Sequence, residues 1–280
     1  MTSSLFDQIE ESAAFLRARG IDGLDGAIVL GTGLGGLTAQ MEILQSIAYD
    51  DIPHFPEATV EFHSGKLLFG ILEGKRVLVM QGRFHYYEGH DFASIAYGIR
   101  VFKAMGAPYV LLSGAAGTMR IDWNKGDLML VTDHIHLLPG NPLIGNNDER
   151  LGPRFPDMSE AYNAGLNRAL RAAAEEEAVD LNEGVYVSAQ GPMLETAAEY
   201  RYLRNIGADA VGMSTTPEVI VANHARLPVA CVVVLTDECD PDNLQAINIP
   251  ELLSVAAKAE KKLIRLIKNT IQRIDAERLV

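Results

Sequence analysis

Glu195 lies just before a predicted helix in the segment Gly191–Val219. Thr196 and Glu199 have the spacing of a capping box, in which each side chain bonds to the other residue's backbone N–H. The spacing predicts a helix that begins just after Glu195 and ends at Gly207, because glycine commonly follows a helix C-terminus. Glu195 is therefore expected at a loop–helix junction.

A predicted anion site follows in the same segment. The short apolar run ADAVGM leads into Ser214, and Pro217 and Glu218 are typical of the first positions of a helix with Thr216 as its cap. Free backbone N–H groups and the dipole at a helix N-terminus favour an anion, so we expect one beside Ser214. Taken alone, both features are also compatible with two ordinary capped helices whose polar caps face solvent.

Several side chains suited to phosphate or a nucleoside lie within Gly82–His90. If this segment is extended, Arg83, His85 and Tyr87 project to one side and the aromatic residues between them to the other. Arginine offers a planar fork for phosphate oxygens, histidine a further donor, and tyrosine a flat apolar face with a hydroxyl tip. Glu88 is placed to orient the His85 imidazole and to hold it protonated. Such a density of groups favours a site over isolated surface or core residues.

The run Ala27–Gly36 predicts a buried strand that enters a glycine-rich turn. Its glycines match G-x-G-x-x-G, and Asp50 or Asp51 lies near the distance of a ribose-binding acid, as in dinucleotide folds. Pro53 follows directly, where such a fold should continue into a helix. Two other uses of the turn remain open: backbone N–H groups and the Thr32 hydroxyl on a single phosphate, or a purely structural turn.

Apolar runs and turn residues predict the other elements. A hairpin over residues 66–81 turns at Glu73 and Gly74. Strands are expected over 109–118, 127–138, 184–189 and 228–240, and helices over 1–20, 93–105, 157–178 and 250–274. Asp237 lies at the exit of its strand, where ligand groups collect in open α/β sheets. The loop 141–156 has few apolar anchors, and its Phe155 is a candidate contact with a partner subunit.

Composition narrows the class of protein. The 280 residues contain no linker and no repeat that would divide the chain, and 48% hydrophobic residues fill a sizeable core. The formal net charge of −13 argues against nucleic-acid binding, which needs a basic field. Neither Cys231 nor Cys239 has a metal-ligand spacing partner, so a reduced, cytoplasmic setting is expected. The N-terminal helix lacks the features of a signal peptide, and no apolar run is long enough to cross a membrane.

Six segments in order carry a resemblance that covers nearly the whole chain. These are GTGLGG at 31–36, HSG at 63–65, GRFHYYEGH at 82–90, AAG at 115–117, GPMLETAAE at 191–199 and GADAVGMSTTPEV at 207–219. Together they resemble the trimeric purine nucleoside phosphorylases, of the purine nucleoside phosphorylase and methylthioadenosine phosphorylase family. The resemblance implies one α/β domain over 1–280, with a central twisted mixed β-sheet flanked by helices, in a homotrimer.

The resemblance also implies a reaction and a site. Purine nucleoside and inorganic phosphate, a co-substrate, would give free purine and pentose 1-phosphate with no metal or organic cofactor. The phosphate-binding residues would be Thr32, His63, Arg83, His85, Ala115 through its backbone, and Ser214. The nucleoside-binding residues would be Tyr87, Leu194, Glu195, Met213, Asp237, Ile249 and, from the neighbouring subunit, Phe155. The catalytic residues would be His85, Glu88, Glu195 and Asp237.

Three positions depart from the family pattern. Asp237, in a TDECD context closer to the methylthioadenosine phosphorylases, replaces an Asn that faces purine N7. A protonated Asp could donate to N7, and an ionised one could accept from a 6-amino group. Ile249 replaces a His at the ribose 5′ end, which favours a 5′-deoxy or 5′-methylthio group because a buried hydroxyl without a partner costs roughly 1–3 kcal/mol. Gly114 replaces the Asn usually found before AAG.

These departures leave the substrate open. Glu195 is the acid expected for 6-oxopurines, so the sequence favours 6-oxopurine nucleosides with tolerance for 6-aminopurines, and a methylthioadenosine phosphorylase is the alternative. Two other classes of protein remain as rivals. A dinucleotide-dependent oxidoreductase would use the glycine turn for pyrophosphate, whereas a non-catalytic purine-binding module should have lost Arg83, His85 or Glu195.

Overall fold

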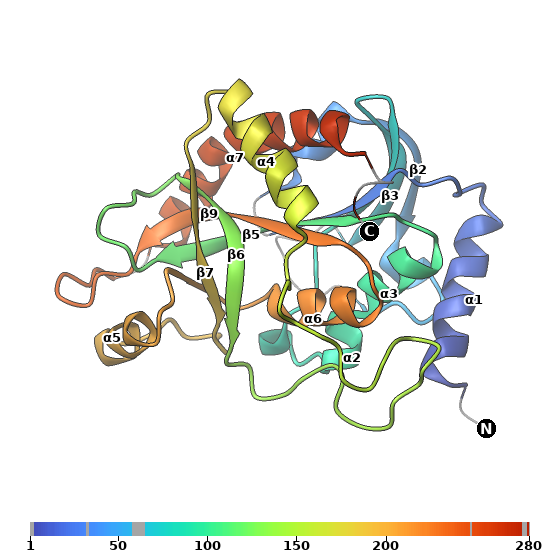
Figure 1. Ribbon diagram of the computed structural model, residues 1–280, viewed down its shortest axis with the longest axis horizontal. Helices are drawn as coiled ribbons and strands as arrows, with labels where there is room; N and C mark the ends of the chain where they lie inside the picture. The colour runs from blue at the N-terminus through green and yellow to red at the C-terminus, as the bar shows by residue number, and fades with distance from the viewer. Residues whose placement is uncertain (1–2, 32–33, 58–64, 247, 276–278, 280) are drawn as a thin grey trace.

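The computed structural model describes residues 3–31, 34–57, 65–246, 248–275 and 279. Strands follow one another in the first part of the chain, and strands and α-helices alternate from residue 128 onward (Figure 1). The strands are β1 (Gly26–Leu30), β2 (Glu42–Ala48), β3 (Lys66–Leu72), β4 (Lys75–Gln81), β5 (Val110–Thr118), β6 (Leu128–His136), β7 (Leu181–Ser188), β8 (Ala210–Gly212) and β9 (Val229–Glu238). The α-helices are α1 (Leu5–Arg17), α2 (Phe92–Ile95), α3 (Tyr97–Ala104), α4 (Ala164–Glu176), α5 (Ala197–Asn205), α6 (Thr216–His224) and α7 (Ile249–Arg273). Each helix in these ranges is too short or too polar to span a lipid bilayer.

The strands form one mixed sheet in the order β2-β3-β4-β1-β5-β8-β7-β6-β9. Strand β9 also pairs with β5, so the last five strands of this order close on themselves. Strand β1 runs parallel to β4 and β5, whereas β3 is antiparallel to both of its neighbours, β2 and β4. The predicted mixed α/β sheet is confirmed. A dinucleotide fold is excluded, because a 3₁₀ turn and the antiparallel strand β2 follow β1 where that fold needs a helix.

Alternation along the central strands builds a core on each face of the sheet. In β1, Ala27 and Val29 pack on one face, and Ile28 and Leu30 on the other. Helices α1, α3 and α6 cover the first face, and α4 and α7 cover the second, where the two helices also contact each other (Figure 1). Helix α5 lies apart at one end and packs on a small third cluster with β7 and β8.

Local sequence signals predicted several elements correctly. The 66–81 hairpin turns at Glu73 and Gly74, whose φ values are 51° and 74°. Helix α5 begins at the predicted capping box, where Thr196 Oγ1 accepts the Glu199 N–H and the Glu199 carboxylate accepts the Thr196 N–H. Gly207 follows the helix with a φ of 99°, a left-handed conformation that glycine adopts without strain.

Other element boundaries differ from the prediction. Helix α4 begins at Ala164, not near 157, because the Asn163 side chain accepts the Leu166 N–H and caps it there. The predicted 93–105 helix is two helices, α2 and α3, that meet at Ala96. Residues 86–88 form a 3₁₀ turn within a segment predicted to be extended.

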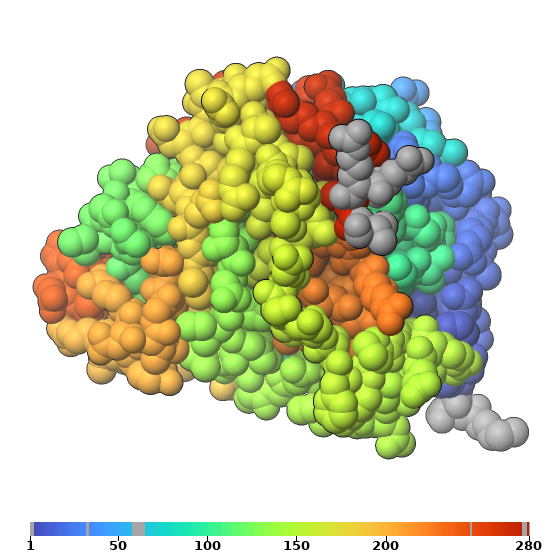
Figure 2. All heavy atoms as spheres, viewed as in Figure 1, coloured from blue at the N-terminus to red at the C-terminus, as the bar shows by residue number. Residues whose placement is uncertain are grey.

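The loop 141–156 contains no helix or strand, as predicted. In Figure 2 it forms a ridge, in yellow-green, that reaches the blue N-terminal helix α1. Arg150 makes this contact: its guanidinium stacks over the Phe6 ring at 4.1 Å and donates to Ser4 Oγ at 3.3 Å. The loop is therefore anchored on α1, although it carries few apolar residues of its own.

Candidate active site

A cavity of about 460 Å³ opens where β5, β8 and β9 end. Its wall combines residues that are far apart in sequence. They are Arg83, His85, Tyr87, Gly114, Ala115, Ala116, Gly117, Pro192, Leu194, Glu195, Tyr200, Val211, Gly212, Met213, Ser214, Thr236, Asp237, Ile249 and Leu252. Most of the predicted site residues therefore share one cavity.

Arg83 enters this cavity from the segment after β4 and is almost fully buried. Its Nη1 donates to the Ser113 carbonyl oxygen at 2.7 Å and lies 3.3 Å from Ser214 Oγ. On its other side, Nε and Nη2 lie 3.3 Å and 3.1 Å from the two carboxylate oxygens of Glu218, which is equally buried. Burial raises the pKa of Glu218, and the Arg83 charge opposes that rise. The arginine is thereby fixed in one orientation next to Ser214.

Ser214 is presented by a tight turn before α6. Thr215 has a φ of 68° and a ψ of −56°, and the Thr216 N–H donates to the Ser214 carbonyl oxygen at 2.7 Å, which together define a strained γ-turn. The helix cap is thus Thr215 rather than the predicted Thr216. The turn leaves the Ser214 hydroxyl beside Arg83 at the N-terminus of α6. This arrangement suits an anion, since strained backbone persists mainly at functional sites.

His85 lies beside Arg83, and Glu88 holds it there. Glu88 Oε1 lies 2.6 Å from His85 Nδ1 and accepts the His85 backbone N–H at 2.9 Å. The imidazole stacks on the Tyr87 ring with centroids 4.7 Å apart. Burial lowers the pKa of His85, and the hydrogen bond with Glu88 opposes that shift. Glu88 itself lies behind His85 and does not line the cavity.

Two glycines, Gly31 and Gly114, allow close packing beside the cavity because they have no Cβ. A Cβ on Gly31 would lie 2.7 Å from Gly114 Cα, so β1 and β5 approach here only because position 31 is glycine. A Cβ on Gly114 would lie 3.2 Å from Arg83 Nη1, in the space that the guanidinium uses. The adjacent residue, Ala115, lines the cavity.

Glu195 lines the cavity from the residue just before the N-cap of α5. Burial raises the pKa of its carboxyl, and the nearby Asp237 charge adds to the rise. Tyr200, from the first turns of α5, forms a hydrogen bond with Glu195 that acts in the opposite direction. The raised pKa of Glu195 makes it a candidate acid or acceptor for a ligand in this cavity.

Asp237 lines the same cavity near the end of β9. The pairing of β5 with β9 shifts by one residue there: Ala116 pairs with Leu235, whereas Gly117 pairs with Asp237 and skips Thr236. An irregularity of this kind re-aims side chains that a regular strand would place on opposite faces. Thr236 and Asp237 consequently both line the cavity, and Thr236 Oγ1 donates to Asp237 Oδ1 at 2.9 Å.

The remaining predicted residues divide into three groups. Met213, Leu194 and Ile249 line the cavity with mainly apolar surface. Phe155 lies outside the cavity of its own chain, and its side chain is 87% exposed. The predictions for Thr32 and His63 lie outside the described residues.

Sequence reasoning missed three residues of the site. The sequence indicates only that Glu218 lies in the first turn of α6, whereas the structure shows it as the buried counter-charge of Arg83. Tyr200 was not predicted as a site residue, because it lies on the apolar face of α5 and no sequence pattern indicated a polar role for it. Thr236 reaches the cavity through the register shift in β9, which no local sequence signal revealed.

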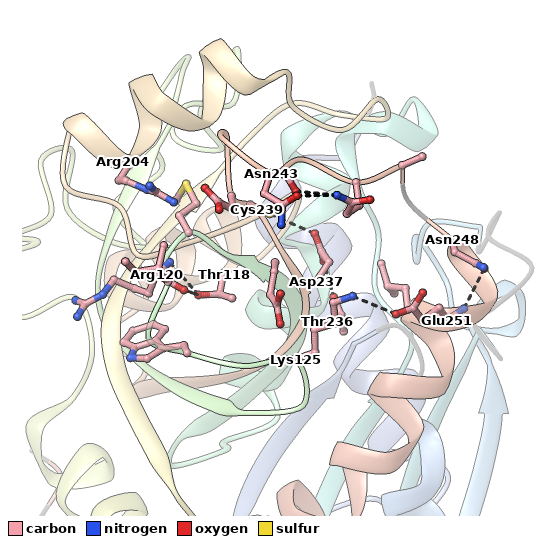
Figure 3. Close-up of a pocket in the computed structure, with 18 residues that line it drawn as sticks. Thr118, Arg120, Lys125, Arg204, Thr236, Asp237, Cys239, Asn243, Asn248 and Glu251 are labelled. Carbon is pink, nitrogen blue, oxygen red and sulfur yellow. Dashed lines mark hydrogen bonds and ion pairs between the residues drawn. The ribbon is translucent and has the colours of Figure 1, made fainter.

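A second cavity of about 470 Å³ lies behind Asp237 (Figure 3). It shares Thr236, Asp237 and Leu252 with the first cavity. Its wall is more polar, and Lys125 is paired there with Glu251 at 3.1 Å. Asp237 therefore lies between the two cavities and lines both of them.

Known proteins resemble this chain along most of its length. The family model of the Phosphorylase superfamily matches residues 26–272. Purine nucleoside phosphorylase 1 of Geobacillus stearothermophilus is 43% identical over 264 residues, which cover 94% of this chain and 96% of that relative.

Solved structures agree with this similarity. A Schistosoma purine nucleoside phosphorylase in complex with hypoxanthine has a TM-score of 0.91 and 35% identity, and the match covers 98% of this chain and 100% of the other. The Schistosoma mansoni purine nucleoside phosphorylase in complex with adenosine has a TM-score of 0.90 and 36% identity over 96% and 98% of the two chains.

Proposed function

This chain belongs to the Phosphorylase superfamily and is a purine nucleoside phosphorylase, which is a pentosyltransferase; from this premise we propose how its cavity catalyses the cleavage of a purine nucleoside by phosphate. The bond between C1′ and purine N9 breaks, and its electron pair leaves with the purine. A phosphate oxygen bonds to C1′, which gives pentose 1-phosphate, and the purine takes up a proton. The site must therefore supply an anion beneath the sugar and polar groups at the base.

Phosphate would occupy the end of the cavity that contains Arg83. The single observation that carries this assignment is the convergence of Arg83, Ser214 and the N-terminus of α6, which offers a fixed guanidinium, a hydroxyl and backbone N–H groups. His85 would add a donor, since a bound phosphate dianion favours its protonation. The phosphate would then stabilise the positive sugar and also act as nucleophile.

The base would lie between Glu195 and Asp237, with the ribose near Tyr87 and Met213. An ionised Glu195 can accept the N1 proton of a 6-oxopurine, and an ionised Asp237 can accept from a 6-amino group. We therefore propose 6-oxopurine nucleosides as the main substrates, with tolerance for 6-aminopurine nucleosides. The Schistosoma relatives, bound to hypoxanthine and to adenosine, are in keeping with such a range.

A methylthioadenosine phosphorylase is the second candidate function, and Ile249 favours it. This residue lines the cavity and offers no partner to a ribose 5′-hydroxyl, whereas a 5′-methylthio group would pack on it. Asp237 would serve the 6-amino group of that substrate equally well.

One assay decides between these functions. Release of free purine is measured with and without phosphate from inosine, adenosine and methylthioadenosine. We expect phosphate-dependent cleavage of inosine, with slower cleavage of adenosine. A rate confined to methylthioadenosine would replace our assignment with the second candidate, and cleavage without phosphate would contradict both.

A matched variant tests the phosphate site within the same assay. Arg83→Ala should raise the KM for phosphate about 100-fold or more, because a buried charged donor to the phosphate is lost. Lys66→Ala, which removes a cation from the exposed start of β3, is the control and should leave that KM unchanged. An unchanged KM in Arg83→Ala would remove Arg83 from the phosphate site.

We also propose a homotrimer in which Phe155 reaches the site of a neighbouring subunit, and a cytoplasmic location. The exposure of Phe155 on a loop anchored to α1 supports the first. Two free thiols, Cys231 and Cys239, support the second, because such thiols persist in reducing compartments. Phosphate is the only other substrate that the proposed reaction needs.

A further inference from the structure

The carboxylate of Asp237 is held from two sides, and one of the donors is a thiol. Thr236 Oγ1 donates to Oδ1 at 2.9 Å, and Cys239 Sγ donates to Oδ2 at 3.2 Å. Figure 3 shows Thr236, Asp237 and Cys239 together along the wall of the second cavity. A carboxylate held in this way offers acceptor lone pairs to a base in the first cavity.

The thiol has little freedom to move. Cys239 is 1% exposed, and its backbone N–H donates to the Thr118 carbonyl oxygen at 2.8 Å. Its side chain belongs to the small core cluster that also contains Tyr200 and Val211. Gly117 opposes this pair across the sheet: an added Cβ there would collide with Cys239 Sγ and lie 2.7 Å from Asp237 Oδ2. Thiol and carboxylate therefore fit together only because position 117 has no side chain.

We propose that Cys239 is a positioning residue that, together with Thr236, fixes Asp237 as a hydrogen-bond acceptor at the base and so determines how well the pocket takes 6-aminopurine nucleosides. The proposal rests on the function proposed above. A 6-amino group donates a hydrogen bond and gains from a fixed acceptor. A 6-oxo group accepts and gains nothing from it, because two acceptors repel each other.

Without the thiol, only Thr236 would hold Asp237. That hydroxyl also lies 3.3 Å from the Ala116 carbonyl oxygen, so its single proton has a second acceptor available. The carboxylate could then rotate toward the polar second cavity, which it already borders. Adenosine would lose its acceptor, whereas inosine would be relieved of an unfavourable neighbour.

The test compares Cys239→Ala with Cys239→Ser, on adenosine and on inosine at saturating phosphate. We expect Cys239→Ala to lower kcat/KM for adenosine about tenfold, mainly through KM, and to change the inosine value by less than about twofold. Cys239→Ser keeps a donor and should retain most of the adenosine activity. Cys231→Ala removes the other buried thiol, which does not line either cavity, and should leave the ratio of the two activities unchanged.

Several outcomes would overturn the proposal. An equal loss with both nucleosides would assign Cys239 a packing role only, and failure of Cys239→Ser to rescue adenosine cleavage would exclude the hydrogen bond. A wild-type enzyme that cleaves inosine but not adenosine would also reject the inference while the proposed function stands. A wild-type enzyme that releases no purine from any nucleoside with phosphate would instead reject the proposed function.

Discussion

Arg83 and Glu218 form a buried ion pair in which only the arginine reaches the cavity. Removing one partner of such a pair costs several kcal/mol, because the other charge stays buried without its counter-charge. Phosphate beside Arg83 would supply that counter-charge. Glu218 is therefore expected to stabilise the empty site more than the phosphate-bound one.

Glu218→Gln tests this expectation by thermal unfolding. The variant should lose about 3 kcal/mol of unfolding free energy without phosphate, and saturating phosphate should restore more stability to it than to the wild type. Glu183→Gln is a matched control, since it breaks an exposed pair with Arg171 and should cost at most about 1 kcal/mol. Equal losses with and without phosphate would show that the pair is unrelated to the anion site.

Glu195 provides a prediction on pH. Burial raises its pKa, so the carboxyl takes up a proton at a higher pH than an ordinary glutamate does. Only the ionised form accepts the N1 proton of a 6-oxopurine. The kcat/KM for inosine should therefore fall on the acidic side, approaching tenfold per pH unit below that raised pKa, and the fall should begin above the pH at which free glutamate titrates.

A comparison of variants separates this effect from that of His85. Glu195→Gln should have a lower kcat/KM for inosine than the wild type. That value should no longer fall at acidic pH. The pKa of His85 is lowered by burial. Its protonation at low pH would strengthen phosphate binding, whereas protonation of Glu195 would weaken inosine binding. That titration should appear in the KM for phosphate, and an unaltered acidic fall in Glu195→Gln would remove Glu195 from the base site.

At the scale of elements, helix α5 positions Glu195 through its capping box. Thr196→Ala should lower the unfolding free energy by about 1 kcal/mol and raise the KM for inosine several-fold, because the loop that carries Glu195 loses its anchor. The KM for phosphate should not change, since Arg83 and Ser214 lie on other elements. Thr196→Ser keeps the capping oxygen and should behave like the wild type; a phosphate effect as large as the inosine effect would point to general loosening.

Elements with complete local signals could be predicted from sequence, and those set by tertiary contact could not. The capping box of Thr196 and Glu199 and the turn pair Glu73–Gly74 are complete signals within a few residues. Helix α5 and the β3–β4 hairpin were therefore predicted correctly. The register shift that turns Thr236 into the cavity depends on the pairing of β9 with β5. The γ-turn at Thr215 depends on what packs around it, and the sequence there looks like an ordinary helix start.

The same distinction applies to the site as a whole. Chemical type and motif order indicated Arg83, His85, Ser214, Glu195 and Asp237, which the fold brings to one cavity from four separate segments. Glu218, Tyr200 and Thr236 act through contacts with those residues, and such contacts exist only once the sheet is assembled. Direct ligand groups can thus be inferred from sequence patterns, whereas the residues that hold them require the structure.

At the scale of the whole molecule, the proposed trimer predicts that each site needs two chains. Phe155 is 87% exposed and lies outside the cavity of its own chain, so a complete site would combine Arg83 of one subunit with Phe155 of the next. At a phosphate concentration near the wild-type KM, Phe155→Ala and Arg83→Ala should each be nearly inactive. When the two variants are refolded together, however, some sites would combine an intact Arg83 with an intact Phe155.

The expected recovery can be calculated. In random trimers of equal amounts of the two variants, half of the sites contain the intact Arg83, and half of those adjoin an intact Phe155, so about a quarter of the wild-type activity should return. Activity is measured on the mixed trimers after their mass is checked by light scattering. Mixing without refolding is the control and should return nothing. Full activity in Phe155→Ala alone, or no recovery in mixed trimers, would show that each chain builds its site alone.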